Sequence, residues 1–389
     1  MFRMEKSEII KKFLTKGIQI TGSALDFFAS NPEKIDTFLS EQLHYPSTIT
    51  LEFINEALKT SQTSAAQSIK PYKEREKVSV NDIVDFFNKR YEFLGNLLSK
   101  RLDLINLISI NRVSEKVKIF SIIGMVKEKN TSNKTAVVED STGEIELALS
   151  ETLLNQLVED EIVGVVCRKD GIIYGEKLVF PDIPLQREIN KTNEEKYIFL
   201  ISDIHMDSEQ FRRESYEKLL DWLEKQQSKL TIFVVGDISS KKEDIVKFLS
   251  DLPSTHEIHV IKGDIDGDID RDTLPNPAFV QIENVKLFLF HDKSLNEYMS
   301  LWGTPEQTLI NLIKKRHLNP TFSLNSKIYD NDPYLLDAIP DIVVAAHSHI
   351  PSVTNYKGTT AVSIGSFVSQ PIFWLMDLRT RETFKIDFS

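Results

Sequence analysis

The sequence predicts a multidomain α+β protein, in which a helical N-terminal segment and a small β-barrel precede a C-terminal α/β domain. Apolar residues recur at helical spacing in the first 107 residues and at the shorter spacing of strands between 117 and 179. From residue 197 onward, apolar strands alternate with amphipathic helices. A chain of 389 residues is long enough for each part to have its own core.

Composition narrows the class of protein. Hydrophobic residues make up 41% of the chain and charged residues 27%, which is ordinary for a globular protein. No run approaches the ~18 apolar residues of a membrane span. Residues 1–15 lack the apolar core of a signal peptide, and the single Cys167 excludes an internal disulfide. We therefore expect a cytoplasmic protein without membrane contact.

The formal net charge of −11 argues against a protein that holds DNA by itself. Proteins that grip duplex DNA usually present a basic face to the phosphates. The basic clusters here are short and lie at 70–77 and 314–316. If the chain works on nucleic acid, we expect much of the grip to come from a partner.

Residues 1–60 are predicted to form a small helical domain, with helices near 9–14, 21–28 and 47–59. We interpret it as a helical bundle that carries no chemistry. The stretch 61–79 then becomes polar, contains Pro71 and ends in a charge run. This composition is typical of a linker.

Residues 80–185 are predicted to form a helix followed by an OB-fold domain. The helix is expected over 80–107, and the five short strands over 117–126, 134–138, 144–149, 161–168 and 171–179. OB barrels of this size bind single strands or other proteins. Only Phe120 and Tyr174 suggest themselves as base-stacking aromatics. The sequence therefore favours a protein-contact role for the barrel.

In the last part of the chain, residues with metal-binding side chains follow the ends of apolar strands. Strands are predicted over 197–201, 230–235, 256–261, 285–290 and 342–346. The residues that follow them, in chain order, are Asp203, His205, Asp237, Asp264, His291, His347 and His349. Carboxylates and imidazoles suit a pair of divalent ions, and strand ends are where α/β folds build sites. Each piece alone is weak, whereas the ordered series predicts a metal centre.

This series resembles the D-x-H, G-D-x-x-D, G-N-H-D/E, H and G-H-x-H motifs of the calcineurin-like metallophosphoesterases. The resemblance implies an α/β/β/α phosphoesterase domain over 190–389 and two metal ions, with Mn²⁺ preferred and Fe²⁺ or Zn²⁺ as alternatives. The implied ligands of one ion are Asp203, His205, Asp237 and His349; those of the other are Asp237 as bridge, Asp264, His291 and His347.

The sequence also departs from these motifs. Asp264 replaces the family's asparagine, and Ile265 replaces the histidine that is expected to assist phosphate chemistry. Ser240 stands where the second motif has its last aspartate, and Ala346 stands where the last motif begins with glycine. All the ligand positions can still bind a metal, but the catalytic residue at the histidine position is missing. Loss of a general acid or base costs about 10² to 10⁴ in rate.

The acidic run over 264–272 has two further interpretations. A calcium loop with Gly267 in its sixth position would place Lys262 and Thr273 at the terminal ligand positions, so this interpretation fails. The second interpretation is a solvated acidic turn, which we expect for Asp268, Asp270 and Asp272. The core ligand set could also be a structural relic with an empty or half-filled site.

A more specific resemblance covers residue 80 to the end of the chain. Segments that carry it are Asp85 to Tyr91, Lys315 to Pro320, Ile339 to Ile342, and Tyr356 to Gly358 followed by Ser363 to Ser366. They are similar to segments of the small subunit of the archaeal D-family DNA polymerase. The order of helices, linker, barrel and phosphoesterase domain also resembles the B-subunits of eukaryotic replicative polymerases.

The resemblance implies a small subunit that scaffolds a large catalytic polymerase subunit in a heterodimer. It also implies DNA contact mainly through the complex, a sliding clamp or primase as additional partners, and a 3′–5′ exonuclease site. Two forms of this hypothesis stay open, one with a weakened or lost nuclease and one with an active nuclease. A free-standing metal-dependent phosphodiesterase for a small substrate is the alternative, although it leaves the barrel without a purpose.

Overall fold

The structure is a computed structural model that describes residues 6–15, 19–31, 35, 48–51, 54, 66–68, 72–269, 271–324 and 327–389. The chain divides into two compact units, Met1–Ala65 and Ala66–Ser389. Each unit has its own apolar core.

The first unit contains helices α1 (Lys6–Leu14) and α2 (Gly22–Ser30), as the sequence predicts. Their buried faces meet through the rings of Phe13 and Phe28, whose centroids are 5.3 Å apart. Beside the helices, β1 (Gln19–Ile20) pairs in parallel with β2 (Thr48–Ile49). The helix expected over 47–59 falls mostly outside the described residues, and its described start is this strand.

The described part of the stretch 61–79, which the sequence predicts to be a linker, makes contacts within the second unit. Strand β3 (Gln67–Ser68) pairs antiparallel with β12 (Ala278–Ile282) at the edge of a sheet. The hydroxyl of Tyr72 donates to the carbonyl of Pro277 at 2.7 Å. These are mostly backbone contacts, which impose no apolar pattern on the sequence.

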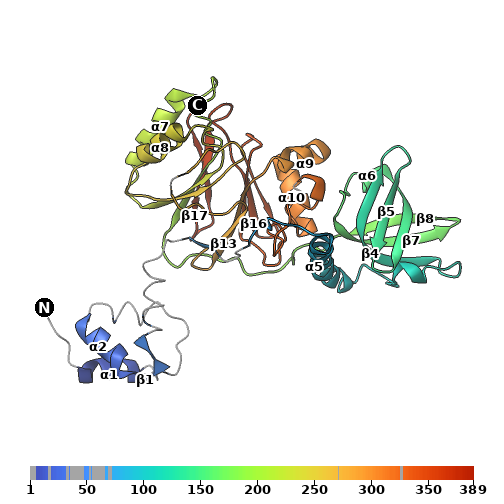
Figure 1. The fold of residues 1–389 in the computed structure, drawn as a ribbon, viewed down its shortest axis with the longest axis horizontal. Helices are drawn as coiled ribbons and strands as arrows, with labels where there is room; N and C mark the ends of the chain where they lie inside the picture. The colour runs from blue at the N-terminus through green and yellow to red at the C-terminus, as the bar shows by residue number, and fades with distance from the viewer. Residues whose placement is uncertain are drawn as a thin grey trace. The chain divides into compact units, whose positions relative to one another are not determined.

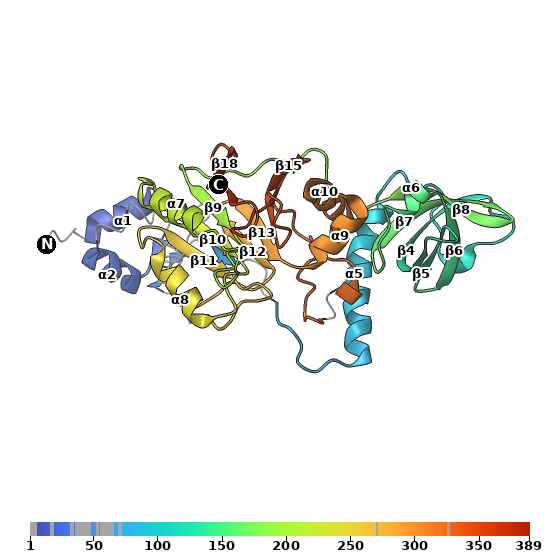
Figure 2. The same ribbon diagram turned by 90° about the horizontal axis from the view of Figure 1, so that it is seen from above.

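Helix α5 (Val80–Ser99) begins with a capping box, in which Ser79 and Asp82 satisfy each other's backbone N–H groups. The helix ends before the predicted limit of 107. The chain turns back there, because Leu104 packs with Leu94 and Leu98 of the same helix against the barrel. In Figure 2, α5 runs alongside the barrel. Tertiary packing thus ends the helix where local propensity would extend it.

Five strands close into a barrel in the order β4-β5-β6-β8-β7. They are β4 (Ile119–Asn130), β5 (Thr135–Asp140), β6 (Gly143–Leu149), β7 (Ile162–Asp170) and β8 (Ile172–Val179). Helix α6 (Glu151–Leu154) connects β6 to β7, and β6 pairs in parallel with β8. All five strands lie close to their predicted ranges. A short 3₁₀ helix, η1 (Ile110–Arg112), precedes the barrel.

The barrel does not offer the two aromatic side chains that the sequence suggested for stacking on bases. Phe120 is fully buried in the barrel core, so this candidate is not available to stack on a base. Tyr174 is half-buried, and the guanidinium of Arg168 lies 4.8 Å from its ring centroid.

The C-terminal part of the second unit contains two sheets, with strand orders β11-β10-β9-β17-β18 and β15-β16-β14-β13-β12-β3. The strands of the first sheet are β9 (Tyr197–Ile201), β10 (Leu230–Val235), β11 (Glu257–Ile261), β17 (Ile372–Asp377) and β18 (Thr383–Asp387). Those of the second, besides β3 and β12, are β13 (Val285–His291), β14 (Ile342–Ala346), β15 (Ser352–Tyr356) and β16 (Thr359–Ser363). Strands β9, β10 and β14 have the predicted bounds.

Two pairs of helices cover these sheets (Figure 1). Helices α7 (Arg213–Glu224) and α8 (Lys242–Asp251) pack their apolar faces into the large core that both sheets share. Helices α9 (Ser294–Trp302) and α10 (Pro305–Lys315) pack on the other face of the second sheet. A 3₁₀ helix, η2 (Phe322–Leu324), follows α10. No helix among the described residues is long and apolar enough to cross a membrane.

A buried ion pair connects the barrel to α10. The ammonium of Lys315 lies 2.6 Å from Glu161 Oε2, and their side chains are 2% and 1% exposed. Lys315 also donates to the carbonyl of Gln156 at 2.7 Å, and its ammonium lies 4.2 Å from the ring centroid of Phe180. Arg316 is buried as well. The basic cluster at 314–316 is therefore mainly part of an internal interface rather than a surface for phosphates.

A second buried pair connects α5 to the segment after α10. The guanidinium of Arg90 lies 2.8 Å from Asp332 and donates to the carbonyl of Pro320 at 2.7 Å. His317 is also buried, and its Nε2 lies 2.9 Å from the same carboxylate. The segment from Lys315 to Pro320 therefore contacts the barrel through Lys315 and α5 through the carbonyl of Pro320.

Candidate metal centre

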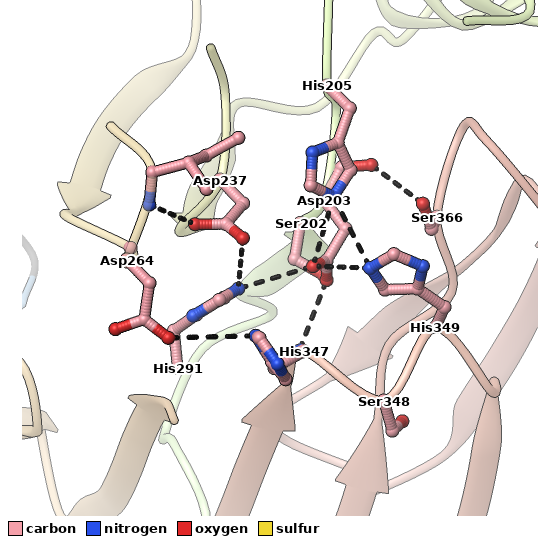
Figure 3. A network of polar contacts seen from close by, with 12 residues as sticks. Ser202, Asp203, His205, Asp237, Asp264, His291, His347, Ser348, His349 and Ser366 are labelled. Carbon is pink, nitrogen blue, oxygen red and sulfur yellow. Dashed lines mark hydrogen bonds and ion pairs between the residues drawn. The ribbon is translucent and has the colours of Figure 1, made fainter. Parts of the chain in front are cut away.

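The predicted ligand side chains lie where the two sheets present the carboxyl ends of their strands. The parallel strands β9, β10 and β11 end just before Asp203, Asp237 and Asp264. In the second sheet, β13 ends at His291, and the parallel strand β14 is followed by His347. Because parallel strands end at the same edge, residues far apart in the chain converge at one place (Figure 3).

Six of the seven predicted residues form two groups whose ligand atoms lie within 4.8 Å of one another. One group is Asp203, His205 and His349; the other is Asp237, His291 and His347. Asp264 belongs to neither group, but its Oδ2 lies 3.8 Å from His347 Nδ1 and its side chain is half-exposed. The structure thus brings the predicted residues together, while their binding of metal stays a prediction.

The carboxylate of Asp203 is completely buried, and its two oxygens have different partners. Oδ2 accepts hydrogen bonds from the Ser202 hydroxyl at 2.7 Å and from the His347 N–H at 3.3 Å. The Ser366 hydroxyl donates to the carbonyl of Asp203 at 2.9 Å. These bonds hold the residue in place and leave Oδ1 for other partners.

Oδ1 of Asp203 faces three imidazoles, as Figure 3 shows. It lies 3.1 Å from His349 Nε2, 3.2 Å from His291 Nε2 and 3.7 Å from His205 Nε2. Burial alone would raise the pKa of this carboxyl, but hydrogen bonds from the three histidines outweigh it and hold the pKa well below its ordinary value. Asp203 is therefore a carboxylate at neutral pH, which is the form that binds a metal.

Asp237 belongs to the second group and lies next to His291. Its Oδ2 lies 3.4 Å from His291 Nε2, which in turn faces Asp203. Its Oδ1 accepts a hydrogen bond from the backbone N–H of Ile265 at 3.1 Å. His291 thus contacts one carboxylate of each group, and the bridging role of Asp237 stays a prediction.

Ligand positions on both sides of the centre have backbone conformations that L-residues seldom adopt. Asp203, His205, Asp237, His347 and His349 have φ angles of 51°, 49°, 56°, 85° and 58°. A left-handed conformation costs non-glycine residues about 1–3 kcal/mol each and persists only where the surrounding structure enforces it. These five backbone conformations therefore lower the stability of the fold while they direct the five side chains toward one place. A cost of this kind is typical of a functional site.

Two glycines permit the close approach of the loops that carry the ligands. A Cβ at Gly263 would overlap the backbone N and carboxylate of Asp237, and one at Gly236 would lie 2.5 Å from the His291 ring. Gly236 also has a φ of 79°, which favours glycine. Steric contact therefore explains why glycine precedes Asp237 and Asp264 in the sequence.

Asp266 has a role that the sequence did not assign. Its buried carboxylate accepts hydrogen bonds from the backbone N–H groups of Asp237 at 2.9 Å, Ile238 at 2.6 Å and Gly263 at 2.8 Å. Burial nevertheless raises its pKa, since desolvation outweighs these bonds. Asp266 fastens two ligand loops to each other. The sequence could have indicated this role, because Asp266 occupies the last position of the G-N-H-D/E motif.

Ile265 supplies only its backbone to the centre. Its side chain is 39% exposed and cannot transfer a proton, while its N–H donates to Asp237. Residue 265 therefore offers Asp237 a backbone N–H but neither an acid nor a base.

The donor set fits divalent metal ions. The two groups combine carboxylate oxygens with imidazole nitrogens, which suit ions such as Mn²⁺, Fe²⁺ or Zn²⁺. The Nδ1 atoms of His291 and His347 are buried and have no hydrogen-bond partner among the residues that the structure describes. Buried polar atoms normally have a partner, so these two nitrogens fit a role as metal ligands.

The chain is similar to known proteins both over this domain and over most of its length. Residues 197–380 match the calcineurin-like phosphoesterase superfamily domain. The DNA polymerase II small subunit of Methanothermobacter thermautotrophicus is 26% identical, over 94% of this chain and 88% of that protein. The protein of the same name from Thermoplasma acidophilum is 22% identical, over 95% and 88%. That from Archaeoglobus fulgidus is 26% identical, over 76% and 72%.

These archaeal relatives match the helical and barrel regions as well as the phosphoesterase domain, since they align with most of the chain. The chain is therefore similar over most of its length to the DNA polymerase II small subunits, and its residues 197–380 match the calcineurin-like phosphoesterase superfamily domain.

Proposed function

We propose that this chain is the small subunit of a D-family replicative DNA polymerase and scaffolds a large catalytic subunit in a heterodimer. The observation that carries the proposal is the extent of the similarity, which reaches 94% of the chain. A free-standing phosphodiesterase would need only the phosphoesterase domain. The acidic net charge of −11 fits a subunit that meets DNA mainly within a complex.

We also propose that the chain is divided into domains at residues 1–60, 61–79, 80–185 and 190–389. Within the linker range 61–79, strand β3 pairs with β12 of the last domain. We assign the barrel to the OB fold. Its strand order, with α6 between β6 and β7, supports the assignment. The burial of Phe120 favours contact with proteins over stacking on bases. A sliding clamp or primase are the further partners that we propose.

At the metal centre we propose two divalent ions, with Mn²⁺ preferred over Fe²⁺ or Zn²⁺. The proposed ligands are Asp203, His205, Asp237, Asp264, His291, His347 and His349. Such ions, when bound, orient and polarise a phosphate and lower the pKa of a bound water. The chain itself would fix the ion positions through Asp203 and Asp237, whose loops Asp266 and Ser202 hold.

The 3′–5′ exonuclease activity of this centre is proposed to be weak or lost. The chain supplies negative and imidazole donors to ions, but Ile265 offers no proton to a leaving group. The absence of a general acid lowers the rate by about 10² to 10⁴. Scaffolding would then be the principal task of the subunit.

Co-expression with the large polymerase chain of the same organism tests this proposal. We expect the two chains to elute together from a size-exclusion column in equal amounts. The Asp203→Ala variant should form the same complex, because scaffolding does not need the metal centre. A chain that elutes alone and hydrolyses a small diester such as bis-p-nitrophenyl phosphate would instead support the free-standing phosphodiesterase.

A further inference from the structure

A cavity of about 420 Å³ opens directly beside the second ligand group. Its walls come from the ends of β11 and β13, the start of α9, and the segment around η2. The lining residues are Asp264, Asn276, His291, Asp292, Lys293, Ser323, Leu324, Lys327, Tyr329 and Tyr334. A volume of this size is in the range of pockets that hold small ligands, and it would accommodate about one nucleotide.

The carboxylate of Asp292 lines the cavity and accepts hydrogen bonds from uncharged donors within the protein. Asp292 is buried, and its Oδ2 accepts hydrogen bonds from the Tyr334 hydroxyl at 2.5 Å and from Asn319 Nδ2 at 3.3 Å. Its Oδ1 accepts the N–H of Ser294 at 2.9 Å. This carboxylate is therefore satisfied within the protein and needs no cation from a ligand.

The rim of the cavity carries two lysines. Lys293 is exposed at the start of α9, and its ammonium has no hydrogen-bond or ion-pair partner among the residues that the structure describes. Lys327 forms a 3.0 Å ion pair with Glu74, but both side chains are about half-exposed. An exposed pair of this kind contributes little, so Lys327 can exchange its partner. Lys293 is the cation that is free for a ligand.

The sign of charge in the cavity depends on the metal centre. Asp264 and His291 form the wall on the side of the second ligand group. A divalent ion held there would add two positive charges beside the carboxylates of Asp264 and Asp292, and so strengthen the positive field of Lys293 and Lys327 in the cavity. The cavity would then attract an anion, and it would do so only when the metal is present.

We propose that this cavity is a subsite for one nucleotide of a DNA strand, with Lys293 as the positioning residue for the phosphate next to the metal-bound one. The inference rests on the proposed function and names the substrate class of the same centre. Leu324, Tyr329 and Tyr334 also line the cavity, and the nucleoside would pack against them. Lys293 acts by holding the strand and takes no part in bond cleavage.

The test measures binding rather than turnover. A fluorescein-labelled single strand of about ten nucleotides is titrated with the full chain in Ca²⁺ or in EDTA, and its anisotropy is followed. We expect Lys293→Ala to weaken binding about tenfold in Ca²⁺, since a charge-assisted contact is lost. Lys293→Arg should retain most of the affinity. In EDTA, Lys293→Ala and the unmodified chain should bind equally weakly.

Two controls separate this proposal from others. Lys225→Ala, at the end of α7 and outside the cavity, should bind like the unmodified chain. Deoxyadenosine monophosphate should displace the strand at lower concentration than inorganic phosphate, as a nucleotide subsite requires. Equal binding by Lys293→Ala and the unmodified chain in Ca²⁺ would overturn the subsite. That result would leave co-elution with the large chain untouched, so failure of the proposed function remains a distinct outcome.

Discussion

Replacing Ile265 with histidine is expected to raise the rate of Mn²⁺-dependent nucleotide release from a DNA 3′ end by about 10² to 10⁴. The backbone N–H of Ile265 is bonded to Asp237 at 3.1 Å, so residue 265 is held beside the centre whatever its side chain. The side chain is 39% exposed, which leaves room for an imidazole. The added histidine would supply the general acid or base that this chain lacks.

Two further variants give this experiment its controls. Ile265→Leu keeps an aliphatic side chain and should leave the rate unchanged. Adding Asp203→Ala to Ile265→His should remove the gain, because the new imidazole is useful only beside bound metal. If Ile265→His retains its metal but releases nucleotides no faster than the unmodified chain, the missing histidine is not what limits this centre.

Replacing Lys315 with methionine is expected to lower the free energy of unfolding by about 3–5 kcal/mol. The change removes one partner of a fully buried ion pair and leaves the charge of Glu161 without compensation. It also leaves the carbonyl of Gln156 without its donor. Urea unfolding of the full chain, followed by circular dichroism, measures the loss.

The neighbouring residue supplies a matched control. Lys314→Met removes the same charge one position earlier, where the side chain is only partly buried, and should cost far less. Combining Lys315→Met with Glu161→Leu should recover much of the loss, since an apolar pair can replace a buried ion pair at little cost. Equal effects of Lys314→Met and Lys315→Met would mean that the pair does not stabilise the interface.

The sequence predicted the strands that carry the ligands because those strands are buried on both faces. Continuous apolar runs such as 197–201 and 342–346 have sharp ends, and the ligands follow directly. The same property made the convergence of distant residues foreseeable, since parallel strands end at one edge. The local sequence pattern locates the ligands because each buried strand ends directly before a ligand residue.

Features that depend on tertiary contacts were not foreseeable in the same way. Strand β3 has no apolar alternation, because it is bound mainly through its backbone to β12. Lys315 and Arg316 resemble a surface cluster in sequence, yet Glu161 and the carbonyl of Leu336 lie far away in the chain and bury them. Phe120 has the residue type of a stacking platform, and only the closure of the barrel shows that it faces the core.

The metal content of the purified chain tests most directly whether the ligand framework is intact. After loading with Mn²⁺ and desalting, elemental analysis of the full chain should find two ions per molecule. Asp203→Ala should hold fewer, because it removes the buried carboxylate that faces His205, His291 and His349. Lys225→Ala should bind as much Mn²⁺ as the unmodified chain. A chain that retains no Mn²⁺, or the same amount with and without Asp203, would contradict this account.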